Sequence, residues 1–385
     1  MLNIADTLHA WCRDGRPFAL ATVVQVSGSA PLPPGTALAV DADGTVVGSI
    51  SGGCVEGAVY DLCQQMLQNG GSPARARFGY SDDDAFAVGL TCGGEIDVLV
   101  QRVEPTAQPH LTAALEEAVR GRPAAVAQII DGPDELVGRT LTLLGDGRTY
   151  DGTLGGENED RAVVARARAL LRTGRTAVID IGGDPDTCPT KLSVLVHTHA
   201  TPPRMLIFGA VDFAAALSQA GSFLGYRVTV CDARPVFATP ARFPHAGEVV
   251  VDWPHRYLAT TETDARSAIC VLTHDAKFDI PLLSLALSLP VGYIGAMGSR
   301  RTHEDRNQRL REAGVTTAQL TRLNSPIGLD LGAHTPEETA ISITAEIIAH
   351  THRAPGTPLS HGIDPIHRAD PTAPAPAPAP ARTAV

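Results

Sequence analysis

The chain has 385 residues, of which 44% are hydrophobic and 4% aromatic, and its formal net charge at pH 7 is -11. This length is typical of two domains, and the hydrophobic content is sufficient for a buried core in each. The negative charge and the scarcity of aromatic rings argue against a general nucleic-acid binder or a protein of anionic membrane surfaces.

Seven cysteines are scattered along the chain without a CxxC pair, so the sequence predicts neither a disulfide framework nor a zinc site. The first 17 residues are typical of an amphipathic helix and lack the basic start and cleavage site of a signal peptide. No stretch approaches the ~18–20 apolar residues of a membrane span. We therefore expect a cytoplasmic protein whose cysteines are reduced.

Apolar runs and turn signals predict an α+β domain over residues 1–200. The expected strands are 17–30, 37–40, 46–50, 75–80, 95–103, 124–131, 138–144, 147–154, 177–181 and 191–199, and the expected helices are 1–17, 54–68, 109–121 and 161–172. Asp43-Gly44 predicts a hairpin turn. His197 and His199 share one face of the last strand, and without a third ligand nearby we interpret them as a solvated strand end rather than a metal site.

The segment GSISGGCVEG, residues 48–57, is the first candidate site. It predicts a strand that turns on Gly52 and Gly53 and opens a helix with Cys54 in its first turn. Backbone N–H groups and the helix dipole would stabilise an anion there, either a bound phosphate or the thiolate of Cys54, and such a thiolate has a lowered pKa. The alternative is that Cys54 is only a small buried residue and the glycines only form a turn.

A second cysteine among glycines follows in the segment Thr91-Cys92-Gly93-Gly94, ahead of the strand that begins at Glu95. Glycines allow a backbone to approach a ligand closely and to adopt conformations that other residues avoid. Two such cysteines in one small domain suggest facing sides of one site. Coincidence is the competing interpretation.

Thr201-Pro202-Pro203 predicts a stiff linker, because a residue before proline is held extended. Residues 204–353 then alternate strands and helices, which predicts a Rossmann-like, doubly wound parallel sheet. The expected strands are 204–208, 227–231, 248–251, 268–273 and 291–294, and the expected helices are 213–224, 279–288, 302–313 and 336–350. Residues 354–385 are rich in proline and alanine and predict a disordered tail.

The dinucleotide fingerprint G-x-G-x-x-G/A is incomplete in the first turn of this second domain. Gly209 and Ala214 fit the pattern, but Val211 replaces the glycine at which the backbone meets a pyrophosphate, and Asp212 adds a negative charge beside it. Asp232 stands where a ribose-binding acid belongs. The architecture is therefore expected, whereas tight NAD(P) binding is doubtful.

Two later segments follow strands of this domain, and a third begins its last helix. His274 and Asp275 are placed at the carboxyl edge of the sheet, where ligands of such folds bind. A glycine-rich turn, Gly298-Ser299, leads into a helix with Arg300 and Arg301, which suits a phosphate or carboxylate, although ordinary helix entry with solvated arginines explains it equally well. Residues 335–338, Thr-Pro-Glu-Glu, predict a capping box.

Several of these motifs together resemble a known family. GSAPLPPGTALAV, GSISGGCVEG and LTCGGEIDVLVQ are similar to the amino-terminal domain of the XdhC/CoxI family, and RMLIFGA, THDAKFDIPLL, YIGAMGSRRT and RLNSPIGLDLGAHTPEETAISITAEIIA are similar to its carboxy-terminal Rossmann domain. The resemblance covers about residues 10–350. One departure is that relatives usually carry glycine and histidine where this chain has Val211 and Asp212.

The resemblance implies an accessory protein for molybdenum hydroxylases such as xanthine dehydrogenase or aerobic carbon monoxide dehydrogenase. Such a protein binds molybdenum cofactor, presents it to a cysteine desulfurase for sulfuration, and delivers it to the apo-enzyme. We also expect a homodimer. The alternatives are an NAD(P)-dependent oxidoreductase with His274 or Cys54 near the nicotinamide, and a scaffold that bridges desulfurase and hydroxylase without holding the cofactor.

Thiolates suit a transient hold on thiophilic molybdenum, so Cys54 and Cys92 are the expected metal contacts. Gly52-Gly53 or Gly298-Ser299-Arg300 would cradle the phosphate of the pterin. The full set of expected cofactor-binding residues is Cys54, Cys92, Gly52, Gly53, Glu56, Gly93, Gly94, Gly209, Asp232, His274, Asp275, Gly298, Ser299 and Arg300.

Overall fold

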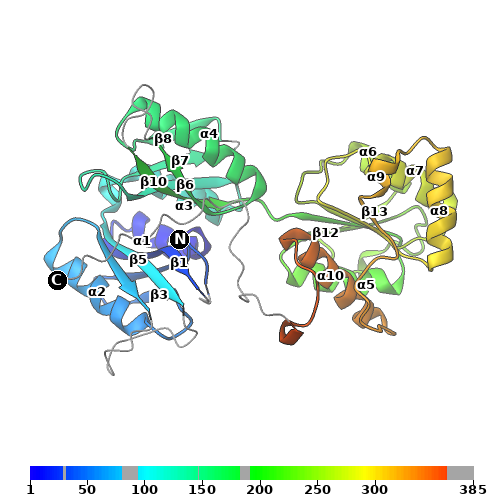
Figure 1. Ribbon diagram of the computed structural model, residues 1–385, viewed down its shortest axis with the longest axis horizontal. Coiled ribbons are helices and arrows are strands. Elements are labelled where there is room, and N and C mark those ends of the chain that lie inside the picture. The colour runs from blue at the N-terminus through cyan, green and yellow to red at the C-terminus, as the bar shows by residue number, and fades with distance from the viewer. Residues whose placement is uncertain (29–31, 80–93, 146, 183–190, 362–385) are drawn as a thin grey trace. The chain divides into compact units, whose positions relative to one another are not determined.

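The computed structural model describes residues 1–28, 32–79, 94–145, 147–182 and 191–361 (Figure 1). The chain forms two compact units, one covering Met1–Thr201 and one that begins at Pro202. Among the helices so described, none is long and apolar enough to span a membrane.

The first unit contains two five-stranded antiparallel sheets. The first sheet has the order β3-β2-β1-β5-β4. Its strands are β1 (Phe18–Ser27), β2 (Ala37–Asp41), β3 (Val46–Gly48), β4 (Ala74–Phe78) and β5 (Glu95–Val103), with helix α1 (Ala5–Arg13) before β1 and α2 (Glu56–Asn69) between β3 and β4. Seven consecutive residues of β1 are buried because α2 packs on one face and the rest of the unit on the other.

The second sheet has the order β8-β7-β6-β10-β9. Its strands are β6 (Ala124–Asp131), β7 (Thr140–Leu144), β8 (Thr149–Gly152), β9 (Ala177–Ile181) and β10 (Leu192–His199), with α3 (Pro109–Val119) before β6 and α4 (Glu157–Thr173) between β8 and β9. Helix α4 covers the outer face of this sheet (Figure 1).

The two halves of this unit therefore repeat one plan, a helix, three strands, a helix and two strands, with the same strand order. We call residues 2–103 the first repeat and residues 108–199 the second repeat. Both central strands carry one extra residue at the same register position, Val24 in β1 and Ile130 in β6. These two residues pack with Leu99 and Leu195, themselves equivalent in the two repeats, in one small buried cluster.

Reciprocal glycine contacts relate the repeats as a two-fold axis would. Gly35 and Gly138 are equivalent, since each donates its N–H to the central strand of its own repeat and has φ near +90° (94° and 86°). A Cβ on Gly35 would clash with Cγ2 of Thr176 in the second repeat, and a Cβ on Gly138 would lie 2.5 Å from Cγ of Pro73 in the first. Each repeat thus presents a glycine to the other in the same way, as an isologous interface requires.

The second unit is built on a six-stranded parallel sheet of order β13-β12-β11-β14-β15-β16, the order of a Rossmann fold. Its strands are β11 (Arg204–Phe208), β12 (Arg227–Asp232), β13 (Glu248–Val251), β14 (Ala268–Val271), β15 (Tyr293–Ala296) and β16 (Leu323–Asn324). Alternate residues of β11 pack on opposite faces, Met205 and Ile207 on one and Leu206 and Phe208 on the other. The expected fold class, an α+β unit followed by a Rossmann-like unit, is confirmed.

Helices cover both faces of the parallel sheet (Figure 1). One face carries α5 (Asp212–Phe223) and α10 (Pro336–His352), which pack on each other, and the other face carries α6 (Pro254–Thr260), α7 (Ala276–Ala286), α8 (Arg300–Glu312) and the short α9 (Thr317–Leu320). The capping box expected at Thr335 and Glu338 is present at the start of α10.

Several sequence-based expectations about the elements are wrong. Helix α6 and the short α9 are not among the expected elements, and α4 begins at Glu157, earlier than expected. Strand β3 ends at Gly48 rather than at Ile50. His197 is not at a solvated strand end, because its side chain is buried in the interface between the repeats, beside Gly35, and burial holds its pKa well below the ordinary value.

Candidate functional site

The loop of residues 49–56 joins β3 to α2 and is organised around the carboxylate of Glu56. Its Oε1 accepts hydrogen bonds from Ser49 Oγ (2.7 Å) and the Ser51 backbone N–H (2.9 Å). Its Oε2 accepts from the backbone N–H groups of Gly53 (2.9 Å) and Val55 (3.2 Å) and from the Ser51 hydroxyl. The loop is therefore held as a closed ring by one side chain from the first turn of the helix that follows it.

This geometry corrects the sequence-based interpretation in two respects. Helix α2 begins at Glu56 with Val55 as its N-cap, so Cys54 precedes the helix instead of lying in its first turn. The backbone N–H groups expected to receive a phosphate or the Cys54 thiolate are largely taken by Glu56. Burial alone would raise the pKa of Glu56, but the hydrogen bonds from Ser51 and Ser49 outweigh it and hold that pKa well below its ordinary value.

Cys54 lies at the open side of this loop. Its side chain is half-buried and packs at the edge of the core beneath α2, and its backbone N–H donates to Ser51 Oγ (3.0 Å). Gly52 and Gly53 beside it are exposed, with φ of 77° and 119°, and a Cβ at either position would meet no atom within 4 Å. Cys54 therefore shows features of both interpretations. Its side chain packs against the core, as expected for a small buried residue, and it lies next to accessible glycine backbone, as expected for a binding site.

Cys92 and Gly93 lie outside the described residues, so a shared site for the two cysteines stays a prediction. Gly94 is buried directly ahead of β5. Over the described ranges, no three His, Cys, Asp or Glu side chains come together in a way that would hold a metal ion.

In the second unit, Gly209 lies at the switch point where β11 separates the two halves of the sheet. Its φ is 113°, and a Cβ there would lie 3.0 Å from Cγ2 of Thr273, which follows β14. A larger residue is therefore excluded, and the carboxyl ends of β11 and β14 adjoin at the place where such folds bind ligands.

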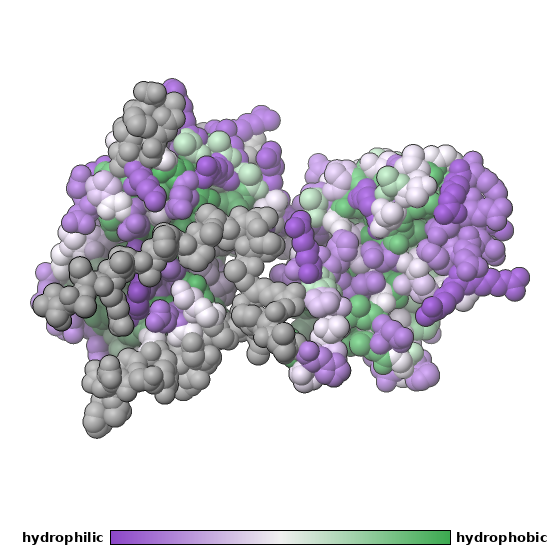
Figure 2. Space-filling model, viewed as in Figure 1, coloured by the Kyte–Doolittle hydropathy of each residue, from purple (hydrophilic) through white to green (hydrophobic). Residues whose placement is uncertain are grey.

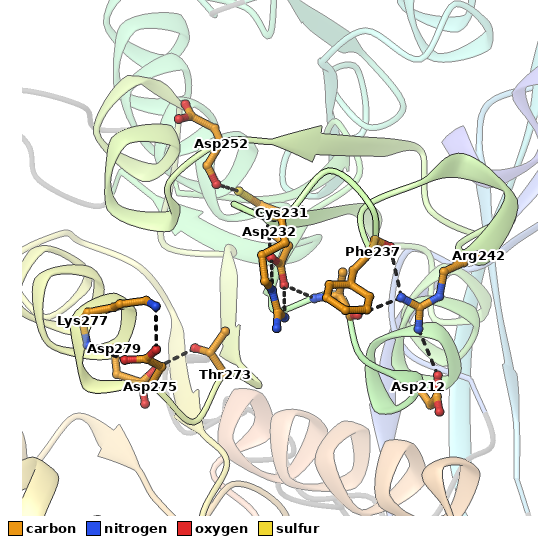
Figure 3. A network of polar contacts seen from close by, with 12 residues as sticks. Asp212, Cys231, Asp232, Phe237, Arg242, Asp252, Thr273, Asp275, Lys277 and Asp279 are labelled. Carbon is orange, nitrogen blue, oxygen red and sulfur yellow. Dashed lines mark hydrogen bonds and ion pairs between the residues drawn. The ribbon is translucent and has the colours of Figure 1, made fainter.

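Asp232, the residue expected to bind a ribose, already accepts hydrogen bonds from other residues of this unit. Asp232 is 2% exposed and accepts hydrogen bonds from the Ala210 backbone N–H (2.8 Å) and from the Arg234 side chain (2.8 and 2.9 Å). Burial would raise the pKa of Asp232, but these partners, Arg234 first, lower it. Asp212 in the first turn of α5 pairs with Arg242 (3.1 Å), so this turn offers a carboxylate where a dinucleotide needs a phosphate site (Figure 3).

His274 and Asp275 follow β14 at the same edge, and both are exposed. Asp275 is the N-cap of α7, since it accepts from the Lys277 backbone N–H (3.1 Å) and pairs with the Lys277 ammonium group (3.0 Å; Figure 3). The pairing with Lys277 lowers the pKa of Asp275. These contacts give Asp275 a structural role and leave His274 as the accessible group of the pair.

The turn of Gly298-Ser299-Arg300 opens α8. Ser299 is its N-cap and accepts from the Thr302 backbone N–H (3.1 Å), while Arg300 and Arg301 are exposed and form no ion pair with any described residue. The exposed face of α8 is almost wholly hydrophilic (Figure 2). The start of α8 therefore has the exposed arginines that the sequence indicated for binding an anion.

The sequence analysis missed Arg306, a buried residue of α8 that holds the Gly298-Ser299 turn in place. It is 3% exposed and donates to Asp279 Oδ2 (3.1 Å), the Met297 carbonyl (2.8 Å) and Ser325 Oγ (3.0 Å). Asp279 also accepts from Thr273 Oγ1 (2.5 Å; Figure 3). One side chain thus ties together the segments that follow β14, β15 and β16. The signal in the sequence was an arginine one turn before Leu310 on the apolar side of an otherwise polar helix.

Comparison with known proteins places these features in a family. The model described as "XdhC and CoxI family" matches residues 11–79 and 118–182, and the model described as "XdhC Rossmann domain" matches residues 205–347. The first model thus matches twice, and each match runs from the helix that precedes β1 or β6 to the end of β4 or β9. This is independent support for the two repeats.

Several relatives align along most of the chain. A probable xanthine dehydrogenase subunit of Bacillus subtilis (strain 168) is 28% identical over 352 residues, which is 90% of this chain and 97% of that protein. The "Molybdenum cofactor insertion chaperone PaoD" of Escherichia coli (strain K12) is 24% identical over 86% of this chain and 83% of its own length. A crystal structure described as a xanthine dehydrogenase from Bacillus halodurans covers 93% of this chain and 98% of its own, at 25% identity and a TM-score of 0.64.

Both units are thus matched by models of one family, and relatives align along nearly the whole chain. The chain belongs to the XdhC and CoxI family.

Proposed function

We propose that the chain is a maturation factor for a molybdenum hydroxylase, which binds molybdenum cofactor and delivers it to the apo-enzyme. The names of its relatives support this role, since one is a molybdenum cofactor insertion chaperone and another is a probable subunit of xanthine dehydrogenase. The observation that carries the proposal is the loop of residues 49–56, which presents the thiol of Cys54 beside open glycine backbone.

The residues of this loop fit a cargo that is held transiently. A thiol is a suitable soft ligand for molybdenum, and Gly52 and Gly53 leave room for a bulky group to approach the backbone. Because Glu56 already takes up most of the loop's N–H groups, we assign it a positioning role: it holds Cys54 in place and does not itself contact the cofactor. We further propose that Cys92 contributes a second thiolate.

On the Rossmann unit, Gly298, Ser299 and Arg300 would bind an anionic group such as a phosphate. The exposed guanidinium of Arg300 is without an ion-pair partner among the described residues, and Arg306 keeps the turn rigid. A tightly bound NAD(P) is not favoured, because Asp232 is engaged by Ala210 and Arg234 and because Asp212 occupies the phosphate end of α5. We therefore prefer a carrier to an oxidoreductase.

Two partners complete the proposal, a molybdenum hydroxylase in its apo form and a cysteine desulfurase that sulfurates the bound cofactor. A homodimer would offer two such cargo sites. The test is delivery: the purified chain is loaded with molybdenum cofactor released from a molybdenum hydroxylase, separated from excess, and mixed with the apo-hydroxylase. We expect recovery of hydroxylase activity with the loaded chain and none with the unloaded chain. Equal recovery with free cofactor and with the loaded chain would contradict a delivery role.

A further inference from the structure

A solvent-open cavity of about 390 Å³ lies on the first unit, lined by residues of both repeats. Gln101 and Arg102 of β5 line it from the first repeat, and Gln108, His110 and Thr140 line it from the second. The volume is within the usual range for sites of small molecules. The cavity is distinct from the loop that carries Cys54. Its lining includes Gly152 and Thr153 of the second repeat but not the equivalent first-repeat residues, Gly48 and Ser49, which lead into the Cys54 loop.

The first repeat shows what the same fold has at the equivalent positions. A Cβ on Gly48 would meet the Ala37 carbonyl and the Ile4 side chain, whereas a Cβ on the equivalent Gly152 would meet the Thr140 carbonyl and the His110 ring. Ile4 therefore corresponds to His110 and Ala37 to Thr140. Leu2 and Gln108 correspond as well, because each lies two residues before Ile4 or His110.

All three first-repeat residues are apolar and belong to, or pack against, the core between the repeats: Leu2, Ile4 and Ala37. Their second-repeat counterparts are an amide, an imidazole and a hydroxyl. The fold is thus compatible with apolar residues at these positions, and the three polar replacements are concentrated around one cavity.

These polar groups are incompletely paired. His110 Nε2 lies 2.7 Å from Thr140 Oγ1, but Gln108 Oε1 is buried and accepts no hydrogen bond from any described residue. Gln101, which is 4% exposed, lies in the lining next to these groups. A buried polar group without a partner costs about 1–3 kcal/mol of stability, so a purely structural role does not explain its presence.

The charged residues of the lining indicate whether a ligand of this cavity would be an anion or a cation. Among the described residues that line the cavity there is no Asp or Glu, whereas Arg102 and Arg139 stand at its edge. Arg102 pairs with Glu104 (2.6 Å), but Arg139 is exposed and has no ion pair with a described residue. A cation is therefore disfavoured, and an anion would meet at least one uncompensated guanidinium group.

We propose that this cavity binds a small organic anion that carries a hydrogen-bond donor. Its negative group faces Arg139, its donor reaches Gln108 Oε1, and the Gln101 amide and the His110–Thr140 pair complete the contacts. This site does not depend on the proposed carrier function, since it lies in a different part of the unit and uses none of the residues assigned to the cofactor.

The test exchanges the cavity for its first-repeat counterpart in the variant Gln108→Leu/His110→Ile/Thr140→Ala. Three probes are titrated by calorimetry into the full chain: inorganic phosphate and citrate, which have few hydrogen-bond donors, and guanosine 5′-monophosphate, which adds ribose hydroxyls and the N–H and NH2 groups of its base. We expect saturable binding that is tightest for guanosine 5′-monophosphate and at least about tenfold weaker in the triple variant. Arg139→Ala should weaken the binding of all three probes. The control Arg120→Ala, which removes an exposed arginine at the end of α3, should leave their binding unchanged.

Thermal unfolding of the same variants separates a ligand site from a structural polar cluster. If the polar groups serve a ligand, the triple variant is as stable as the wild type or more stable, because apolar residues suit this position in the first repeat. A lower melting temperature in the triple variant would overturn the proposal, as would the absence of saturable binding for all three probes or equal binding by wild type and triple variant. Retention of molybdenum cofactor by the triple variant would show separately that the carrier function is intact.

Discussion

The two repeats of the first unit place equivalent loops after equivalent strands, and the comparison shows which parts of each loop serve the fold. In the first repeat, Glu56 reaches back to the hydroxyl of Ser49 and to backbone N–H groups. In the second repeat, Asp160 accepts from Thr153 Oγ1 (2.8 Å) and from the Leu154 backbone N–H (2.7 Å). A carboxylate from the start of the helix closes the loop in both, so this device belongs to the scaffold.

What differs between the loops is their open side. The first loop has Gly53-Cys54, and the second has Glu157-Asn158 at the corresponding place. The first loop also includes Ser51, whose hydroxyl and N–H both bind Glu56. The scaffold is kept and the thiol is not, as expected if Cys54 has the cofactor-binding role that we propose.

The largest expected effect tests the two-fold relation between the repeats. Gly35→Ala and Gly138→Ala each force a Cβ into the other repeat at a positive φ, and we expect each to lower the free energy of unfolding by about 4 kcal/mol. Urea unfolding measures this. The equivalent pair Gly15→Ala and Gly121→Ala is the control, because their added Cβ atoms meet nothing within 4 Å and only the backbone strain of about 1 kcal/mol is expected. Clearly different losses of unfolding free energy for Gly35→Ala and Gly138→Ala would contradict the two-fold relation between the repeats.

A smaller effect is expected from removing the carboxylate that closes each loop. Glu56→Ala and Asp160→Ala leave several hydroxyl and backbone N–H groups without their acceptor, and each variant should lose about 2 kcal/mol of stability. Only Glu56→Ala should also reduce the retention of molybdenum cofactor, because only that loop carries Cys54. Equal loss of cofactor in both variants would show that the repeats do not differ in function.

The smallest effect is a pH dependence of the first loop. The pKa of Glu56 is lowered in the folded state from an ordinary value of 4.5, so its contribution to stability is fully present above that value and is lost as the pH falls below it. The stability difference between wild type and Glu56→Gln should therefore be constant from neutral pH down to about pH 5 and shrink below it. A difference that grows as the solution is acidified would contradict the assigned role of Glu56.

Local signals were sufficient for much of the fold. The strand–Gly209–helix–Asp232 spacing predicts the Rossmann order, the Asp43-Gly44 turn joins β2 to β3, and Thr335 caps α10 as expected. Each of these depends on residues close together in the chain, where turn and cap chemistry decide the conformation.

Features that depend on distant contacts were not predictable from one sequence. The repeats share little beyond Gly15-Arg16-Pro17 and Gly121-Arg122-Pro123 ahead of their central strands, so the duplication is not evident from this sequence by itself and emerges from register and glycine contacts. The burial of His197 follows from the position of the other repeat. The start of α2 was misplaced because the reach of the Glu56 side chain back to Ser51 is a property of the folded loop.

Cofactor retention by a matched pair of loop variants tests the central claim most directly. Wild type, Cys54→Ser and Asn158→Ser are loaded with molybdenum cofactor under identical conditions, freed of excess, and assayed for bound molybdenum and pterin. Both substitutions fall at the same place in equivalent loops, so effects on the scaffold cancel. The account predicts that Asn158→Ser retains cofactor as the wild type does and that Cys54→Ser loses at least about nine-tenths of it, a tenfold change. Retention by Cys54→Ser equal to that of the wild type would contradict the account.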